Sequence, residues 1–505
     1  MPSSPRGLEQ YRERRHPDLT PEPFGSEQTP PSLGPLRFVV QKHAASRMHY
    51  DFRIELGGVL LSWAVPKGPS LDSSTKRLAI RVEDHPLDYL DFEGVIPAPC
   101  YGAGSVIVWD QGVWFPTDDP KKAMAKGHLS FDLRGYKLRG RFSLLRTNAS
   151  ANARGQWLLV KDADKFADGQ HVTSDVSIFS GLLVEERAHV DQRIRALDAQ
   201  LTTLGVPEHE VDARELRPML CTRIDKPFTD PSWLYELKYD GYRSIAEVRK
   251  GRAVLRYRQG LNTTARFPEV RRALELLPCS SCVLDGELVV FDSWGHPDFG
   301  LVQARGGLSR ARDIETARRK TPVTYVVFDL LELNGRDLRA LPLSLRKTLL
   351  ARTVPTLGPI KYCEHIEEAG EAFFARIEER QLEGMIAKRK DSTYGSGRSP
   401  AWKKLHCPVT GDFVIVGYAL STARPEQFAA LHLAAFEGET LRYAGKVGSG
   451  FASQERLDLQ AKLDALPRVA GAVYQGKSSA ADVWVKPSLV ARQALATARV
   501  LGAVP

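Results

Sequence analysis

The chain has 505 residues with 70 Lys and Arg against 61 Asp and Glu, a formal net charge of +9 and a hydrophobic share of 43%. The sequence holds no apolar run of about 18 residues, which excludes helices that span a membrane. A chain of this length predicts about two to four domains, and the composition excludes collagen-like and wholly disordered proteins. The basic excess is mild, so by itself it permits nucleic acid as a partner and indicates nothing more.

The N-terminus and the cysteines indicate the cellular compartment. Residues 1–9 lack the apolar segment of a secretion signal, so we expect a cytoplasmic protein with reduced thiols. The 6 cysteines are too sparse for a disulfide framework. Cys279 and Cys282 form one C-x-x-C pair, but structural zinc needs about four ligands and no second pair has a suitable spacing. We therefore expect ordinary thiols at these positions.

The first half of the chain begins with a tail and continues with a β-rich segment. Residues 1–35 contain eight prolines among Arg, Glu and Ser, which predicts a disordered tail. Residues 36–182 alternate polar and apolar side chains in short runs such as His49–Leu56 and Trp157–Lys161, broken by Gly and Pro. This pattern predicts a compact β domain.

Three further segments follow. Residues 183–212 predict a helical linker, because apolar residues recur at helical spacing up to a glycine C-cap at Gly205. Residues 213–407 mix predicted strands with predicted helices, including one over Glu367–Arg380, as in an α+β domain. Residues 408–505 are again β-rich and predict a separate C-terminal domain. The sequence therefore predicts a multidomain α+β protein.

The strand predicted at His49–Leu56 carries an unusual polar face. Because successive side chains of a strand point to opposite sides, His49, Asp51 and Arg53 share one face while Phe52 packs into a core on the other. Exposure of the polar face to water is the simplest interpretation. However, an imidazole and a carboxylate beside a guanidinium also suit a metal ion next to a bound anion.

Further side chains of the same kinds flank this strand. One histidine precedes it, and a lysine, an arginine, a histidine and a tyrosine follow it: His43, Lys67, Arg77, His85 and Tyr89. Imidazoles and a carboxylate suit Mn²⁺ or Zn²⁺, and the cationic side chains suit a phosphate. Chemistry alone therefore favours a metal-assisted phosphoesterase over a solvated face.

The same region is similar to a known domain. It resembles the 3′-phosphoesterase domain of the ligase D family of bacterial end-joining DNA ligases at residues 38–56 (FVVQKHAASRMHYDFRIEL), 63–70 (WAVPKGPS), 83–97 (EDHPLDYLDFEGVIP) and 101–110 (YGAGSVIVWD). The resemblance implies a β-barrel-like domain over residues 36–182, with Mn²⁺ held by His43, His49 and Asp51. It implies that the 3′-terminal phosphate or ribose is surrounded by Arg53, Lys67, Arg77, His85 and Tyr89. Among these, His85 is the implied acid–base residue.

A second predicted strand carries a candidate nucleophile. Glu236, Lys238 and Asp240 share one face of this strand, and the chain then turns at Asp240-Gly241. A lysine amine attacks only when it is unprotonated, so its surroundings must lower its pKa from about 10.4. An ordinary lysine on a strand edge is the competing interpretation, since four residues are weak evidence.

Downstream motifs resemble the covalent nucleotidyltransferase superfamily, and most closely its ATP-dependent DNA ligases. These motifs are 258–260 (RQG), 284–287 (LDGE), 325–329 (YVVFD), 383–388 (EGMIAK) and 402–406 (WKKLH). The resemblance implies that Lys238 attacks the α-phosphate of ATP and becomes a lysyl-AMP, with Mg²⁺ as a second cofactor. Glu236 would read the adenine amino group and Phe328 would stack on the base. Ribose, phosphates and a catalytic metal would be bound by Arg243, Arg258, Glu287, Glu383, Lys388 and Lys404.

The end of the chain matches the family in part. Phe413–Phe451 resembles the OB-fold domain that closes over DNA in these ligases, whereas Val483–Ala491 matches their last motif incompletely. His406 stands where the family pattern Trp-x-Lys-x-Lys has its second lysine, with Lys404 at the first. A histidine there predicts weaker support for the α-phosphate at alkaline pH, because imidazole is then largely neutral.

The combined resemblance implies an ATP-dependent DNA ligase with a Mn-dependent 3′-end phosphoesterase, acting in double-strand break repair by non-homologous end joining. DNA with nicks or broken ends is the implied substrate, the end-binding protein Ku is the implied partner, and a nucleoid-associated location follows. Since Pro505 ends the sequence, a polymerase module, if one takes part, is expected to act in trans. The alternative is a DNA-binding end-processing scaffold whose ligase half is weak or inactive, and an RNA ligase or capping enzyme is a further rival that the phosphoesterase motifs disfavour.

Overall fold

The structure is a computed structural model in which nine stretches of the chain are described: residues 7–25, 34–147, 155–170, 173–407, 410–421, 427–437, 440–448, 453–469 and 482–494. The chain divides into two compact units. The first holds Met1–Ile224, Phe228–Gly370 and Ile386–Lys404, and the second holds Asp225–Pro227, Glu371–Met385 and Leu405–Pro505. Within the described stretches, each helix is too short or too polar to cross a lipid bilayer.

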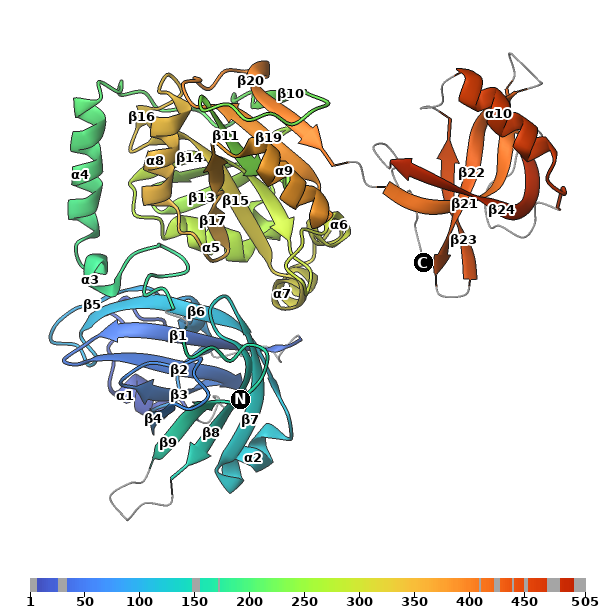
Figure 1. The fold of residues 1–505 in the computed structure, drawn as a ribbon. Helices are drawn as coiled ribbons and strands as arrows, with labels where there is room; N and C mark the ends of the chain where they lie inside the picture. The colour runs from blue at the N-terminus through green and yellow to red at the C-terminus, as the bar shows by residue number, and fades with distance from the viewer. Residues whose placement is uncertain are drawn as a thin grey trace. The chain divides into compact units, whose positions relative to one another are not determined.

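The strands of the N-terminal region close into a barrel, drawn in blue and teal in Figure 1. Neighbours pair in the order β1-β2-β3-β4-β9-β8-β7-β6, β1 also pairs with β6, and β5 is added beside β6. The strands are β1 (Leu36–Ala44), β2 (Met48–Leu56), β3 (Val59–Val65), β4 (Lys76–Arg81), β5 (Gly94–Ile96), β6 (Gly104–Pro116), β7 (His128–Gly135), β8 (Arg139–Arg146) and β9 (Gln156–Lys161). The helices are α1 (Glu9–Glu13), the 3₁₀ helix η1 (Leu87–Asp91) and α2 (Pro120–Lys126). The expected β-barrel-like fold is confirmed.

The alternation predicted for His49–Leu56 is present in β2. Phe52 and Ile54 are fully buried in one cluster with Trp63 and Trp114, so the apolar face of the strand packs into the barrel core. The opposite face carries Asp51, whose carboxylate lies beside side chains of the same face. The barrel core therefore fixes which residues of β2 point toward the candidate site.

The N-terminal segment corrects the prediction of a disordered tail over residues 1–35. Residues 7–25 lie against the barrel, and the Tyr11 side chain is fully buried there. A buried ion pair connects the segment to the barrel region, because Arg15 Nη1 lies 3.2 Å from Glu83 Oε1 and both side chains are 5% exposed. Composition predicted disorder because it reports no tertiary contacts, and these contacts offset the entropy lost on ordering.

A helical connector follows the barrel, as the apolar spacing predicted. It contains α3 (Val184–Arg187) and α4 (Val190–Thr203), which buries Leu197 and Leu201. Gly205 follows the end of α4 with a φ of +68°, a left-handed conformation that glycine adopts without steric cost. The helix and its glycine cap are confirmed, and the exact limits of the linker stay a prediction.

The next region is α+β, as predicted, and is built on two sheets. One sheet has the order β10-β20-β19-β11-β18, and the other has the order β13-β12-β14-β15-β16 with β17 beside β15. The strands are β10 (Met219–Arg223), β11 (Trp233–Leu237), β12 (Tyr242–Arg249), β13 (Arg252–Tyr257), β14 (Ser281–Val290), β15 (Val323–Leu333), β16 (Arg336–Asp337), β17 (Ile360–Tyr362), β18 (His365–Glu367), β19 (Gly384–Arg389) and β20 (Gly397–His406). The helices are η3 (Thr264–Arg266), α5 (Pro268–Glu275), α6 (Phe299–Gly306), α7 (Ala311–Lys320), α8 (Leu343–Thr353) and α9 (Gly370–Glu379).

The helix predicted over Glu367–Arg380 begins later than expected. His365–Glu367 pairs with β11 as strand β18, and α9 begins at Gly370. The apolar spacing extends through this stretch, but Glu368 adopts a φ of +57°, which a helix does not accommodate. Pairing with β11 therefore takes priority over the helical pattern at these residues.

Ion pairs connect helix α7 to the barrel within the first unit. Arg318 Nη2 lies 2.8 Å from Asp91 Oδ2, and Arg319 Nη1 lies 3.2 Å from Glu55 Oε2. Burial raises the pKa of the Asp91 carboxyl, but Arg318 outweighs it and lowers the pKa to about 2. The Arg319–Glu55 pair is buried, and a buried ion pair is weak evidence for added stability.

The C-terminal region, red and orange in Figure 1, contains a four-stranded sheet and one helix. Its strands pair in the order β23-β22-β21-β24, with β21 (Thr410–Leu420), β22 (Phe428–Glu437), β23 (Thr440–Val447) and β24 (Asp482–Ala494), and α10 spans Ser453–Asp464. Tyr418, Leu431 and Val485 form its core. These elements agree with the expected OB-fold, and residues 495–505 lie outside the described part of the chain.

Candidate metal and nucleotide sites

Three side chains on adjacent strands of the barrel form a group suited to a metal ion. His43 comes from β1, and His49 and Asp51 come from β2 directly opposite it, since His43 pairs with His49 in the ladder. Their donor atoms all lie within 4.8 Å of one another. Asp51 Oδ2 is 3.6 Å from His43 Nδ1 and 3.7 Å from His49 Nε2. Two imidazole nitrogens and a carboxylate oxygen are a donor set for Mn²⁺ or Zn²⁺, so the residues present fit such an ion.

The remaining ring nitrogens of both histidines have partners of their own. His43 Nε2 lies 2.8 Å from the carbonyl oxygen of Gly102, and His49 Nδ1 lies 2.9 Å from that of Arg47. Each imidazole can donate from that nitrogen and turn the other toward Asp51, which fixes the tautomer a metal ligand requires. Burial raises the pKa of the Asp51 carboxyl, but Arg53 and both histidines outweigh it and hold the pKa well below its usual range.

A phosphate-sized group of side chains continues from the metal ligands. Arg53 Nη2 lies 3.0 Å from Asp51 Oδ2, and Arg53 Nη1 lies 2.9 Å from His85 Nδ1. The ring of Tyr89 packs edge-on against His85 at 4.8 Å. Burial lowers the pKa of His85 well below 6.5, and the charges of Arg53 and Arg15 lower it further. The lowered pKa favours the neutral imidazole, which can accept hydrogen bonds from the arginines beside it.

Lys67 and Arg77 make fewer contacts than the other expected residues. Lys67 is exposed just after β3, and Arg77 lies half-buried on β4. The buried Nε of Arg77 has no hydrogen-bond partner among the described residues. Both cations are thus available to an anion, whereas Arg53, His85 and Tyr89 are brought into direct mutual contact.

Sequence reasoning missed the residues that the N-terminal segment adds to this site. Arg15 Nη2 lies 3.5 Å from His85 Nε2, and Arg15 Nη1 lies 3.2 Å from Glu83 Oε1. The hydroxyl of Tyr89 donates to Glu22 Oε1 at 2.9 Å, and Tyr11 packs edge-on against His85 at 4.9 Å. The available signal was an aromatic residue with nearby charges inside a proline-rich tail, which does not specify a partner.

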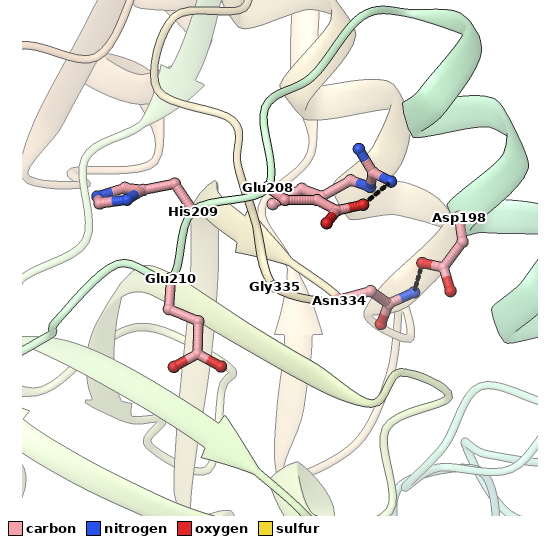
Figure 2. Close-up of a pocket in the computed structure, with 7 residues that line it drawn as sticks. Asp198, Glu208, His209, Glu210, Asn334 and Gly335 are labelled. Atoms are coloured by element: carbon pink, nitrogen blue, oxygen red, sulfur yellow. Dashed lines mark hydrogen bonds and ion pairs between the residues drawn. The ribbon is translucent and has the colours of Figure 1, made fainter.

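The surface also has an acidic hollow whose side chains do not form a metal-binding group. Figure 2 shows this hollow of about 430 Å³ between the end of α4 and the turn before β16, lined by Glu208, His209 and Glu210 among others. Its polar groups are partly paired, since Arg336 Nη2 lies 2.7 Å from Glu208 Oε1 and Asn334 donates to Asp198. Among the described residues, His43, His49 and Asp51 have the geometry of metal ligands, and the side chains of this hollow do not.

The second candidate site is built around the end of β11. Glu236 lies on β11 and is 2% exposed, and Lys238 follows the strand half-buried. Lys388 Nζ from β19 lies 2.6 Å from Glu236 Oε2, and it sits 4.4 Å over the Phe328 ring from β15. The structure therefore brings the residues expected to read and stack the base, Glu236 and Phe328, to the same buried lysine.

Four cations expected to handle phosphate converge near one thiol. Burial raises the pKa of Cys221 on β10, while Lys388, Arg243, Lys404 and Lys238 each lower it through their charges. Arg243 is already engaged, since its Nε and Nη2 lie 3.0 and 2.6 Å from the two Asp285 oxygens. Glu287 lies opposite Arg243 in the ladder between β12 and β14. These four cations thus act on the same thiol, and a group of cations is what phosphoryl transfer requires.

Arg258 donates its backbone N–H to the carbonyl oxygen of Arg243 at 3.2 Å and lines a second hollow of about 420 Å³. The hollow is also lined by Arg217 and Arg256, so its charge is basic. Such a surface suits the phosphates of a polyanion.

Glu383 and His406 both belong to the second unit. His406 Nδ1 lies 3.8 Å from Glu383 Oε1, and both side chains are partly exposed. A carboxylate is therefore the neighbour of the histidine that departs from the family pattern.

Comparisons with protein families match three segments of the chain. Residues 41–146 match the DNA ligase D 3′-phosphoesterase domain. Residues 218–406 match the ATP-dependent DNA ligase domain, and residues 424–500 match the ATP-dependent DNA ligase C-terminal region. Because residues 218–406 match an ATP-dependent ligase domain, ATP and a divalent metal ion are the cofactors of that domain.

Similar proteins agree with these matches. The chain is 40% identical over 498 residues to the multifunctional non-homologous end joining protein LigD of Pseudomonas aeruginosa, covering 96% of this chain and 58% of that protein. It is 34% identical over 493 residues to the multifunctional non-homologous end joining DNA repair protein LigD of Mycobacterium tuberculosis, covering 96% of this chain and 57% of that protein. The solved ligase domain of M. tuberculosis LigD is 30% identical with a TM-score of 0.35, covering 56% of this chain and 90% of that one. The chain thus spans little more than half the length of the two curated LigD proteins, and it belongs to the LigD family, with 3′-phosphoesterase and ATP-dependent DNA ligase domains.

Proposed function

We propose that this protein trims 3′ ends of broken DNA with its barrel domain and seals nicks through a lysyl-AMP with its ligase domains. The observation that carries the proposal is that one chain holds both a His-His-Asp group and, just before Lys238, a buried Glu236 paired with Lys388 over the Phe328 ring. The limits 36–182, 213–407 and 408–505 are proposed for the phosphoesterase, adenylyltransferase and OB-fold domains, with a linker over 183–212, while residues 7–25 pack against the barrel in place of the disordered tail expected over 1–35.

In the barrel domain, we assign the metal site to Mn²⁺ and the surrounding cations to a 3′-phosphate. When bound by His43, His49 and Asp51, the ion would supply a Lewis acid that polarises the phosphoryl group. Arg53 neutralises phosphate oxygens beside the metal ligands, and the neutral His85 accepts a proton from the attacking water. Tyr89 orients His85 through their edge-on contact.

In the ligase domains, Lys238 is the proposed nucleophile. Its unprotonated amine attacks the α-phosphorus of ATP, a phosphorus–nitrogen bond forms, and pyrophosphate leaves. The AMP then passes to the 5′-phosphate of a nick, and the 3′-hydroxyl displaces AMP to join the strand. Lys388, Lys404 and Arg243 offset the phosphate charge, and Glu287 and Glu383 bind the sugar or the Mg²⁺. Arg258 is proposed to bind phosphate within its basic hollow.

Broken or nicked DNA in the bacterial nucleoid is the proposed substrate, in double-strand break repair by non-homologous end joining. Ku at the DNA end and a polymerase acting in trans are the proposed partners. The support is that the curated relatives are described as multifunctional end-joining proteins.

Incubation with labelled ATP and Mg²⁺, followed by nicked DNA, tests the ligase proposal. We expect acid-labile label on the protein that disappears as nicks are sealed. DNA retention on a gel without any protein-bound AMP would instead support the scaffold alternative.

Arg15→Ala is expected to reduce 3′-end trimming by about tenfold or more. The change removes a cation beside His85, leaves the buried Glu22 without its ion pair and leaves Glu83 with Arg14 alone, which costs on the order of 3 kcal/mol. The measurement is release of 3′-phosphate from a labelled primer with Mn²⁺. Arg14→Ala is the matched control, because Arg14 pairs with the same Glu83 from a side chain that is 46% exposed. Equal losses in both variants would contradict a role of Arg15 at His85.

His406→Lys is expected to help adenylation progressively more as pH rises. If His406 faces the α-phosphate as a cation, it loses charge above its reference pKa of about 6.5, whereas lysine at about 10.4 keeps its charge. The ratio of mutant to wild-type adduct formation should climb between about pH 6.5 and 8.5, and this ratio cancels the titration of Lys238. A flat ratio would indicate that Glu383, 3.8 Å away, is the true partner of His406.

A further inference from the structure

The buried carboxylate of Glu236 is held by two lysines, one on each oxygen. Lys347 Nζ from α8 lies 2.6 Å from Oε1, and Lys388 Nζ from β19 lies 2.6 Å from Oε2. All three side chains are at most 3% exposed. Lys347 matches none of the motifs found in the sequence, so its role must come from this geometry.

The two lysines differ in what else holds them. Lys347 also donates to the carbonyl oxygen of Cys363 at 2.6 Å and lies 4.3 Å over the Tyr362 ring. Lys388 instead packs over the rings of Phe328 and Trp402 at 4.4 and 4.1 Å. A backbone acceptor fixes Lys347 in place, whereas aromatic faces leave Lys388 able to move toward a stronger anion.

Charge balance makes Lys347 necessary once nucleotide enters. Burial raises the pKa of the Glu236 carboxyl, and Lys347 and Lys388 outweigh it and hold the pKa below its ordinary value. If Lys388 turns to a nucleotide phosphate, Lys347 is the remaining counter-ion of a carboxylate that is 2% exposed. A buried carboxylate left without any partner would be strongly disfavoured.

We propose that Lys347 is a positioning residue that sets the preference for adenine. It holds Glu236 ionised through Oε1, so that departure of Lys388 frees Oε2 to accept a hydrogen bond from the exocyclic 6-amino group of the base. This inference rests on the proposed role of Glu236 as the reader of that amino group. Lys347 itself touches neither the base nor the phosphates.

Equilibrium binding separates this role from simple structural support. Isothermal titration calorimetry on the Lys238→Ala protein, which forms no adduct, would compare ATP with purine riboside triphosphate, which lacks only the 6-amino group. With Lys347 present, ATP should bind about tenfold more tightly, the value of one hydrogen bond to a charged group. With Lys347→Met added, the ratio should fall to about one.

Two further variants keep the test decisive. Lys347→Arg retains a cation beside Glu236 and should retain the preference for ATP. Lys390→Met removes another lysine–glutamate pair of the first unit, with Glu367, and should leave the ratio at about tenfold. An unchanged ratio in Lys347→Met would overturn the inference, and so would a ratio lost equally in Lys390→Met. In either case, binding of ATP would leave the proposed function intact. If ATP binds none of the proteins, the proposed function itself fails.

Discussion

Lys238→Ala should abolish the protein–AMP adduct and the sealing of ordinary nicks, by at least about a thousandfold. The lysine follows β11 at a half-buried position, two residues before Asp240. Burial raises the pKa of Asp240, and the charge of Lys238 lowers it. The nearby Lys388 is engaged in a buried ion pair with Glu236, so it is a poor substitute nucleophile. Gel detection of protein-bound label from radioactive ATP measures the effect.

Two comparisons define the role of Lys238 more closely. Sealing of nicks that already carry a 5′-adenylate should survive, because that step does not use the lysine nucleophile. Lys320→Ala changes an exposed lysine of α7, and this control protein should take up label like the wild type. Wild-type labelling of Lys238→Ala would mean that another residue is the nucleophile.

His49→Ala and Asp51→Asn should each stop the removal of a 3′-phosphate or a terminal ribonucleotide, by on the order of a hundredfold or more. Each change removes one of three donors that lie within 4.8 Å of one another. Asp51→Asn keeps a hydrogen-bond acceptor for Arg53, which lies 3.0 Å away, so its effect isolates the lost charge. Denaturing gels of a 3′-labelled primer with Mn²⁺ measure the loss, and chelation of the metal should reproduce it in the wild type.

Self-adenylation provides the internal control for these barrel variants. It should be unchanged, because Lys238 and its surrounding cations lie in another domain. His128→Ala changes an exposed histidine of the same barrel and should leave both activities intact. Full end trimming by His49→Ala and Asp51→Asn would exclude this group as the metal site.

Local pattern was sufficient where the functional residues lie on one strand or on its direct neighbour. The period of two in β2 predicts that His49, Asp51 and Arg53 share one face, and the contacts of Asp51 confirm that arrangement. The strand before Lys238 was predictable in part, since Glu236 belongs to β11, but the strand ends at Leu237, so Lys238 and Asp240 follow it and do not share its face as predicted.

Residues supplied from distant segments were not predictable from pattern. Arg15 and Glu22 come from a stretch whose composition indicated disorder, and they gain order only by contact with the barrel. Lys347 lies on α8, 111 residues after its partner Glu236, and an isolated lysine carries no signal of such a partner. In both cases the decisive contact is tertiary, and one sequence does not encode it in a readable spacing.

The barrel extends past the limits suggested by its family match, and this matters for anyone who would excise it. The matched segment is 41–146, yet β1 begins at Leu36 and β9, which joins β8 to β4, spans Gln156–Lys161. A fragment cut at 41 and 146 would open the ring at one seam and remove the stretch that carries Arg15. Its exposed strand edges would then invite self-association. An autonomous version of this domain must therefore begin before residue 7 and continue past Lys161.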